Sequence, residues 1–191
     1  MNFLSIIILP LFGIITIIGI LIYFIRLYNK LKSLDNSAEA TLSQVRVALK
    51  KRFDTISQLL SLVKSYANFE RDTFEAVTKM RTNIMSARVD NLSKFDRDSS
   101  TLLGGIVAVV ENYPTLRASE PVINLMITIK NIEDEIARHR YTYNNIIQEF
   151  NKRLDTIPSK YIAALQHLSK KNYFKFSEDI DEKIDTKFYG A

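Results

Sequence analysis

The chain of 191 residues contains no cysteine, no tryptophan and only two histidines. The absence of cysteine excludes disulfides, thiolate metal ligands and cysteine nucleophiles, and it leaves the redox compartment unspecified. His139 and His167 lie far apart in the sequence, and neither follows a glutamate by three residues, as the Glu-x-x-His repeats of two-iron carboxylate bundles require. The sequence therefore predicts no metal site and no cofactor.

Reactive groups do not converge elsewhere either. The acidic run Glu133-Asp134-Glu135 is contiguous, so its side chains diverge by about 100° from one residue to the next on a helix and cannot form an acid/base pair. His139 falls on an apolar helix face, which favours a structural role. Gly104-Gly105 lacks the following Lys and Ser or Thr of a phosphate loop, so we assign it to close helix packing. The sequence predicts that the protein is not an enzyme.

Charge is absent from Phe3 to Ile25, where 17 of 23 residues are Ile, Leu or Phe. A helix of this length measures roughly 34 Å at about 1.5 Å per residue, which exceeds a hydrocarbon core of about 30 Å. Its apolar residues contribute roughly −5 to −10 kcal/mol to membrane insertion before the few polar and small residues are set against them. The sequence therefore predicts one transmembrane helix, within an anchor segment of residues 1–27.

A cleaved signal peptide is the competing interpretation of this stretch. Signal peptides have a basic n-region, a shorter apolar core and a small-residue cleavage site, and none of these is present here. We therefore favour an anchor. Because Arg26, Lys30 and Lys32 follow the span directly, the positive-inside rule predicts a single-pass protein of the cell membrane, with Met1 outside and the remaining chain in the cytoplasm.

Glycine and proline are scarce, with five and four residues, and neither occurs between Arg26 and Met85. Apolar residues recur there in steps of three and four, which predicts one long amphipathic helix, and we expect the transmembrane helix to continue into it with little break. The sequence thus predicts an all-α fold in which an antiparallel bundle of long helices follows an N-terminal transmembrane helix. The apolar stripe consists of Leu31, Leu34, Ala38, Leu42, Val45, Leu49, Phe53, Ile56, Leu60, Val63 and Ala67.

Further helices follow this stripe. A shift in its phase predicts a kink or tight corner near Tyr66–Glu70, and the polar string Asp90–Ser100 predicts a loop and the start of the next helix. From Val122 to Phe150 apolar residues alternate in steps of three and four, the heptad spacing of coiled-coil-like helices that pack at shallow angles. Pro158 ends that helix. We place the bundle in residues 28–170 and expect residues 171–191 to form a mobile charged tail.

Basic residues are concentrated near the predicted span. Between Arg26 and Arg88 there are 12 basic and 6 acidic residues, within a net charge of +5 for the chain. A cytoplasmic leaflet attracts nearby cations by about 1 kcal/mol each, so this region favours an anionic lipid surface. Nucleic acid is the other partner that a basic surface suits, but no groove-reading motif accompanies it, and we expect no nucleic acid partner.

Aromatic–asparagine pairs recur along the chain. Tyr143-Asn144 and Phe150-Asn151 are seven residues apart, two turns along one helix face, and Tyr28-Asn29 repeats the pair near the membrane. Asparagine at a bundle seam fixes the register of neighbouring helices through hydrogen bonds across them. We expect this structural role; a ligand-facing polar patch is the alternative.

With these pairs the chain resembles the LemA proteins, membrane-anchored helical bundles of bacteria and some archaea. The resemblance covers nearly all of residues 28–158. Its blocks include Tyr28-Asn29, Ser43-Gln44-Val45, Lys50-Lys51-Arg52-Phe53-Asp54, Val109-Val110-Glu111-Asn112-Tyr113-Pro114, Glu133, Arg140, Tyr143-Asn144, Phe150-Asn151 and Pro158. The chain departs from the family's usual Trp, Asp, Pro, Gly and His at Leu42, Arg46, Ser57, Ser65 and Phe69.

The resemblance implies long antiparallel helices behind one N-terminal span, and it implies neither an established activity nor catalytic residues. We expect the structural or interaction positions to be Tyr28, Asn29, Gln44, Arg52, Asp54, Arg140, Tyr143, Asn144 and Asn151. The leading hypothesis is a non-catalytic, membrane-tethered interaction or scaffold protein of the cell envelope, which presents its bundle to a protein partner or to another copy of itself. A protein that binds anionic lipid through its basic first helix is the second, and an enzyme with an unrecognised site is the third.

Overall fold

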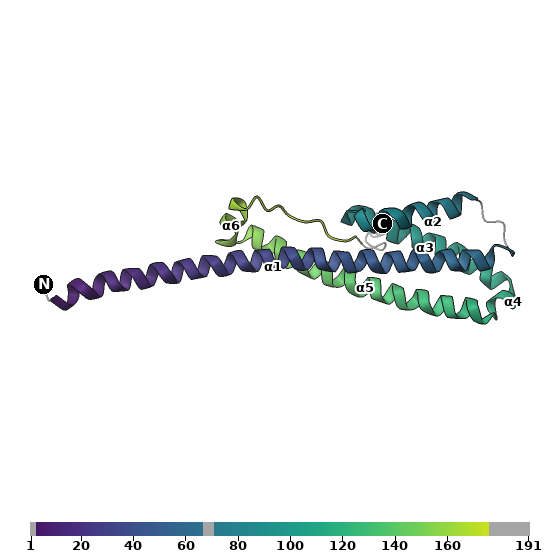
Figure 1. The fold of residues 1–191 in the computed structure, drawn as a ribbon, viewed down its shortest axis with the longest axis horizontal. Coiled ribbons are helices and arrows are strands. Elements are labelled where there is room, and N and C mark those ends of the chain that lie inside the picture. The colour runs from purple at the N-terminus through teal and green to yellow at the C-terminus, as the bar shows by residue number, and fades with distance from the viewer. Residues whose placement is uncertain (1–2, 67–70, 176–191) are drawn as a thin grey trace, which may run out of the picture. The chain divides into compact units, whose positions relative to one another are not determined.

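The computed structural model describes residues 3–66 and 71–175. Over these residues the chain forms six α-helices, one 3₁₀ turn and no strand (Figure 1), which confirms the expected all-α fold. In chain order the elements are α1 (Phe3–Val63), α2 (Arg71–Asn83), the 3₁₀ turn η1 (Ile84–Ser86), α3 (Val89–Asn112), α4 (Pro114–Arg117), α5 (Glu120–Asp155) and α6 (Ser159–Leu165).

Helix α1 is a single unbroken helix of 61 residues. It contains the uncharged stretch and the amphipathic stripe, so the expected continuity between them is confirmed. Within the described residues α1 is the one helix that is long and apolar enough to cross a membrane, with a mean hydropathy of 2.2 over its most apolar stretch, none of which is buried. Because such exposure of apolar surface is unfavourable in water, this stretch is consistent with a membrane anchor.

The chain divides into two compact units. Unit 1 consists of residues 1–39 and 145–171, and unit 2 consists of residues 40–144 and 172–191. Helices α1 and α5 each contribute residues to both units.

In unit 2, contacts along α1 define the directions of its neighbours. The Lys51 ammonium lies 3.4 Å from the Glu135 carboxylate, whereas Leu62, further along α1, lines a hollow with Leu125, which comes earlier on α5. Helices α1 and α5 are therefore antiparallel, as the sequence predicts.

Helices α2 and α3 also belong to unit 2, and the successive directions of α1, α2, α3 and α5 alternate in an up-down-up-down order. Asp54 on α1 pairs with Arg81 near the end of α2, and Lys64 lies over the ring of Phe74 near its start, so α2 runs antiparallel to α1. The α3 helix runs parallel to α1, since Arg46 donates to the main-chain oxygen of Ala87, just before α3 begins, and Arg52 donates to Ser100 within α3. Figure 1 shows these helices with their labels.

The core of unit 2 is built from the predicted stripe. Phe53, Ile56 and Leu60 are fully buried on α1, and burial of each such side chain contributes about 1.5–3 kcal/mol. The stripe residues of unit 2, from Leu42 to Val63, are all buried; the earlier ones, from Leu31 to Ala38, are buried or half-buried in unit 1, and Ala67 lies outside the described residues. The other helices supply Val77, Leu92, Ile106, Ile129, Ile136 and Tyr143.

Unit 1 has a core of its own. Leu31 of α1 is fully buried there with Phe150 and Leu154 of α5, and Ile162 and Ala163 of α6 complete the cluster. Helix α5 ends at Asp155, before Pro158, as expected. The part of α1 that follows the candidate span thus packs with α5 and α6 in the core of unit 1.

Two local expectations from the sequence are wrong, and two others lie partly outside the described residues. The polar string Asp90–Ser100 is not a loop: α3 begins at Val89, because Leu92, Asp96 and Ser99 form a buried helix face within that string. Gly104 and Gly105 do not mediate close packing, since a methyl group added at either would have no atom within 4 Å. The expected corner follows the end of α1 at Val63, and its residues 67–70 lie outside the described residues, as does most of the predicted tail, residues 176–191.

Candidate functional site

A buried charge cluster joins three helices of unit 2. The Arg52 side chain, 3% exposed, donates hydrogen bonds to Asp96 Oδ1 at 3.0 Å, Ser100 Oγ at 3.0 Å and Glu133 Oε1 at 2.8 Å. Arg140 donates through Nη1 to the other oxygen of the Asp96 carboxylate. The cluster therefore links α1, α3 and α5 through two guanidinium groups and two carboxylates, whose charges cancel.

The electrostatics of this cluster favour a structural role. Burial lowers the pKa of the Arg52 guanidinium from its ordinary value, and the neighbouring Asp96 and Glu133 carboxylates oppose that shift by stabilising the charged form. An arginine remains charged at neutral pH even so, which makes it unsuited to proton transfer. A buried pair of this kind is costly to break, because removing one partner leaves an uncompensated charge.

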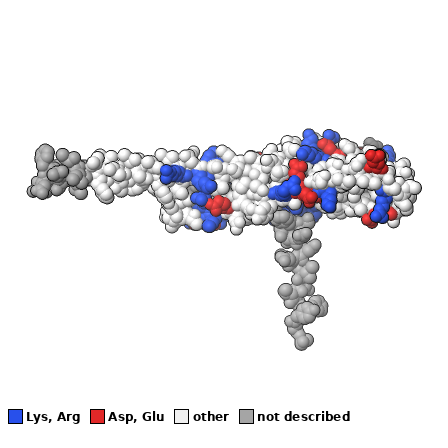
Figure 2. All heavy atoms as spheres, turned by 90° about the horizontal axis from the view of Figure 1, so that it is seen from below, with Lys and Arg blue, Asp and Glu red and all other residues white. Residues whose placement is uncertain are grey.

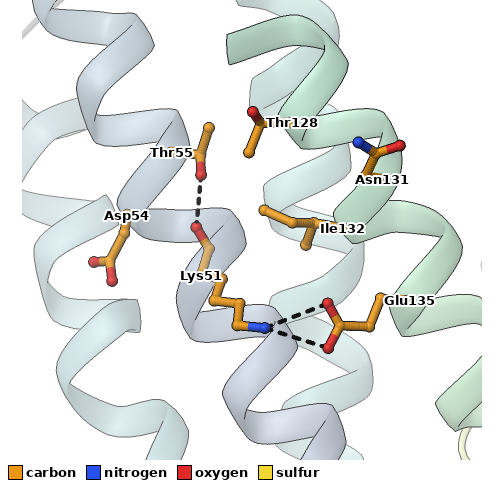
Figure 3. Close-up of a pocket in the computed structure, with 7 residues that line it drawn as sticks. All are labelled: Lys51, Asp54, Thr55, Thr128, Asn131, Ile132 and Glu135. Carbon is orange, nitrogen blue, oxygen red and sulfur yellow. Dashed lines mark hydrogen bonds and ion pairs between the residues drawn. The ribbon is translucent and has the colours of Figure 1, made fainter. Parts of the chain in front are cut away.

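A hollow of about 360 Å³ lies between α1 and α5, next to this cluster, and we call it the polar hollow because six of its seven lining residues are polar or charged, although the aliphatic parts of their side chains supply much of its surface. Figure 3 shows Lys51 and Glu135 facing each other across it, with 3.4 Å between the ammonium and each carboxylate oxygen. The Thr55 hydroxyl on the same helix donates to the Lys51 main-chain oxygen at 2.9 Å. The other lining residues are Asp54, Thr128, Asn131 and Ile132. Such paired and solvated groups suit polar contact with another molecule better than bond making.

A second, more apolar hollow lies further along the same two helices. Leu62, 39% exposed, and Leu125 line it together with Pro121. Its remaining lining residues are Gln58, Ser61 and Asn124. The α1–α5 surface of unit 2 thus presents a polar and an apolar hollow in succession.

Asn144 in unit 2 holds a non-helical segment that follows α6. Its side-chain amide donates to the main-chain oxygen of Phe174 at 2.9 Å and accepts the main-chain N–H of the same residue at 2.8 Å. The Phe174 side chain is 1% exposed, and the Arg140 guanidinium lies 5.8 Å from its ring centroid. The Tyr143 hydroxyl donates to the main-chain oxygen of Asn172 at 3.2 Å.

Asn151 repeats this pairing within unit 1. Its amide donates to the main-chain oxygen of Lys171 at 2.9 Å and accepts the Lys171 N–H at 3.0 Å. Lys171 also forms an ion pair with Asp35 of α1. The hydrogen bond and charge of Lys171 lower the pKa of the Asp35 carboxyl against the opposing effect of burial.

These contacts change the interpretation of the two asparagines. We expected them to bond across helices and fix register, but their amides bond to the main chain of the segment after α6. The physical reason is that an isolated non-helical segment leaves main-chain groups unpaired, and a side-chain amide satisfies both groups of one residue. Residues 171–175 of the expected mobile tail are therefore held by hydrogen bonds.

The remaining predicted positions lie apart from these contacts. Asp54 pairs with Arg81 on α2. Tyr28, Asn29 and Gln44 are exposed on α1. The Tyr28-Asn29 pair thus stands apart from the two pairs on α5, each of which bonds a main-chain segment.

Sequence reasoning missed the partners of the predicted residues, above all Asp96 and Phe174. Asp96 is 4% exposed and follows buried Leu92 by four residues, a spacing that places it on the apolar face of α3. A carboxylate on that face was the available signal for a buried ion pair. No comparable signal marks Phe174, because Asn144 bonds its main-chain groups, which every residue type other than proline carries.

Comparison with known proteins identifies the family to which this chain belongs. A model of the LemA family matches residues 41–188. The chain belongs to the LemA family. The match extends through the segment at 171–175, and therefore includes both main-chain pairings as well as the buried charge cluster.

Three relatives are similar to this chain over most of their own length. Protein LemA of Metamycoplasma hominis is 27% identical over 178 residues, which cover 92% of this chain and 81% of the relative. Magnetosome protein MamQ 2 of Paramagnetospirillum magneticum is 22% identical over 205 residues, covering 93% and 75% of the two chains. MamQ of Magnetospirillum gryphiswaldense is 20% identical over 189 residues, covering 85% and 70%. Together with the candidate span, these similarities suggest a membrane-associated protein, and none of the names indicates catalysis.

The binding of lipid through a basic first helix is not favoured in this LemA family member. Arg52 is buried among carboxylates, Lys51 faces Glu135, and Lys32 lies 3.6 Å from Asp35. Figure 2 shows an uncharged N-terminal part of α1 and, on the face in view, basic and acidic residues intermixed beyond it. Because these cations already interact with acidic groups, little unpaired charge from them is left to attract an anionic surface.

Proposed function

We propose that this LemA family protein is a non-catalytic, membrane-tethered interaction or scaffold protein of the cell envelope, which holds a protein partner or another copy of itself. The observation that carries the proposal is the continuity of α1: one helix contains the uncharged stretch and then supplies buried residues to both units. A helix shared in this way couples a membrane anchor directly to the helical units without a flexible linker.

The α1–α5 surface of unit 2 is the part that we assign to the partner. It carries the polar hollow at Lys51 and Glu135 and the apolar hollow at Leu62 and Leu125. Protein interfaces combine an apolar centre with polar surroundings, and this surface offers both within a few helical turns. The buried Arg52 and Asp96 of unit 2 are paired with each other as guanidinium and carboxylate, which supports a structural rather than a chemical role for them.

We further propose that both units lie on the cytoplasmic side. Arg26, Lys30 and Lys32 are exposed on α1 directly after the uncharged stretch, which is the arrangement that the positive-inside rule associates with the cytoplasm. Because the chain has no cysteine, a single Lys94→Cys variant reports the side unambiguously. A membrane-impermeant maleimide should label it only after the cells are permeabilised, and labelling of intact cells contradicts the orientation.

The proposed surface is tested with a photo-crosslinking amino acid in the full-length protein in its native membrane. Position Gln58, on the α1–α5 surface, should give a discrete crosslinked species, and position Arg97, exposed on α3, serves as the control. Alanine at Leu62 should reduce the Gln58 species. Absence of any crosslink at Gln58, together with unchanged complexes after alanine substitutions at the exposed positions between Arg46 and Lys64, contradicts the proposal.

A further inference from the structure

The segment Asn172–Lys175 occupies a binding site of unit 2 that recognises main chain. Asn144 pairs with both main-chain groups of Phe174, and Tyr143 donates to the main-chain oxygen of Asn172. The Lys175 N–H donates to Ser93 Oγ of α3 at 3.3 Å. Four main-chain groups are thus bound by three side chains, which is the chemistry of β-strand addition with side chains in place of a neighbouring strand.

Side-chain recognition at this site is limited to two points. The first is the buried ring of Phe174, which faces the Arg140 guanidinium. The second is Asn172, whose amide lies 3.1 Å from the Asp90 carboxylate. The intervening Tyr173 side chain is 45% exposed. The site therefore accepts a short non-helical peptide with one buried aromatic residue, and its specificity rests on that residue.

We infer that this site also binds the same segment of a second copy of the chain, so that neighbouring copies exchange their segments after α6. An exchanged segment makes the same contacts as the original one, and the balance between the two states is then set by effective concentration. The same reasoning applies to Lys171, which is bound by Asn151 of unit 1 through an identical pairing.

The chain length before the segment restricts the partner to an adjacent copy. The stretch from Leu165, the last residue of α6, to Lys171 spans at most roughly 20 Å when fully extended. That reach is about twice the diameter of a helix. Confinement in a membrane raises the local concentration of copies, so exchange should increase with the density of the protein in the bilayer. The inference concerns a surface other than the α1–α5 surface and does not depend on it.

The absence of native cysteine allows a direct test with full-length protein in liposomes. One tagged population carries Asp90→Cys and one untagged population carries Asn172→Cys, and both are reconstituted together and treated with a short bismaleimide. Exchange predicts a crosslinked tagged–untagged dimer whose yield rises with protein density. A control pair, Arg97→Cys with Asn172→Cys, reports proximity without exchange, because Arg97 is exposed and lies two helical turns, about 10 Å, beyond Asp90 on α3.

Two further variants assign the dimer to the site. Phe174→Ser on the Asn172→Cys copy, or Asn144→Ala on the Asp90→Cys copy, should lower the yield by about fivefold or more, because each removes a central contact. Tyr173→Ser should leave the yield unchanged. Equal yields from the Asp90 and Arg97 pairs, or no dimer while a doubly substituted Asp90→Cys/Asn172→Cys chain crosslinks internally, overturns the inference.

Discussion

The side-chain amide of Asn144 binds both main-chain groups of Phe174, at 2.8 and 2.9 Å, although the two residues are 30 positions apart in the sequence. Through this pairing a residue that belongs to no helix, Phe174, is bound to α5 within unit 2. It also places the Phe174 ring beside Arg140, a member of the buried charge cluster. The Tyr143-Asn144 pair therefore binds the main chain of the segment after α6, whereas the sequence predicts hydrogen bonds across helices that set their register.

Substitution of Asn144 by alanine should release the segment. Two hydrogen bonds of about 1 kcal/mol each are lost, so the amide of Phe174 should exchange its hydrogen roughly 30-fold faster. Hydrogen exchange of the full-length protein in detergent measures this effect. Asn145→Ala is the matched control, because Asn145 is the exposed neighbour on the same helix. Equal protection of Phe174 in the two variants contradicts the assignment.

Removal of Arg52 should be among the most destabilising single changes in unit 2. Arg52→Met leaves Asp96 with Arg140 as its partner and removes the contact to the half-exposed Glu133, so the expected loss is roughly 3 kcal/mol in the free energy of unfolding, the lower end of the range for a broken buried pair. The exposed Lys50→Met variant should change it by less than about 0.5 kcal/mol. Chemical unfolding in detergent followed by circular dichroism provides the comparison.

A double substitution separates the charge effect from packing. Arg52→Met combined with Asp96→Leu removes the charge and its main partner together, so the double variant should be less destabilised than the sum of the single variants. Additive losses would show that the two residues act independently, contrary to the 3.0 Å contact between them.

The ion pair between Asp35 and Lys171 should make the stability of unit 1 depend on pH. Because the pKa of Asp35 is lowered in the folded state below its ordinary value of 3.8, its contribution is present above that value and is lost as the pH falls through the folded pKa. Asp35→Asn should therefore lower the melting temperature at pH 7, by an amount equivalent to about 1 kcal/mol or less. Once the pH is well below the folded-state pKa of Asp35, the variant and the original protein should melt alike.

A pH-independent difference would contradict this account of Asp35. Asp134→Asn is the control, since Asp134 is exposed on α5. That variant should show little difference from the original protein at either pH.

Alanine at the two glycines of α3 should stabilise the protein. Gly104 and Gly105 are helical and exposed, and an added methyl group meets no atom within 4 Å, so each Gly→Ala change should add about 0.5–1 kcal/mol through reduced backbone freedom of the unfolded chain. Ala108→Gly, at an exposed position of the same helix, should have the opposite effect of similar size. Destabilisation by Gly104→Ala would indicate that another molecule approaches α3 closely there.

The sequence was sufficient to predict what depends on periodicity. The spacing of Leu31 to Val63 predicts the buried face of α1 because a helix places every third or fourth residue on one side. The spacing from Val122 to Phe150 predicts α5 for the same reason. An uncharged stretch of sufficient length likewise predicts the candidate span.

Contacts between distant residues could not be predicted in this way. The partner of Arg52 is Asp96, 44 positions away, and helix periodicity gives the face of each residue but not the register between helices. The main-chain bonds of Phe174 depend on no side-chain pattern in the segment itself. The glycines of α3 show the opposite error, since their small size indicates that close packing is allowed and not that it occurs.

The central claim is that α1 anchors an interaction protein in the membrane, and crosslinking of the full-length protein in its native membrane tests it most directly. After mild crosslinking and detergent extraction, the account predicts a membrane-integrated chain recovered with a stoichiometric partner, either a foreign protein or further copies of itself. Recovery of the chain as an uncrosslinked monomer, under conditions that crosslink a known membrane complex, would contradict it. Release of the chain from the membrane by alkaline carbonate would contradict the anchor itself.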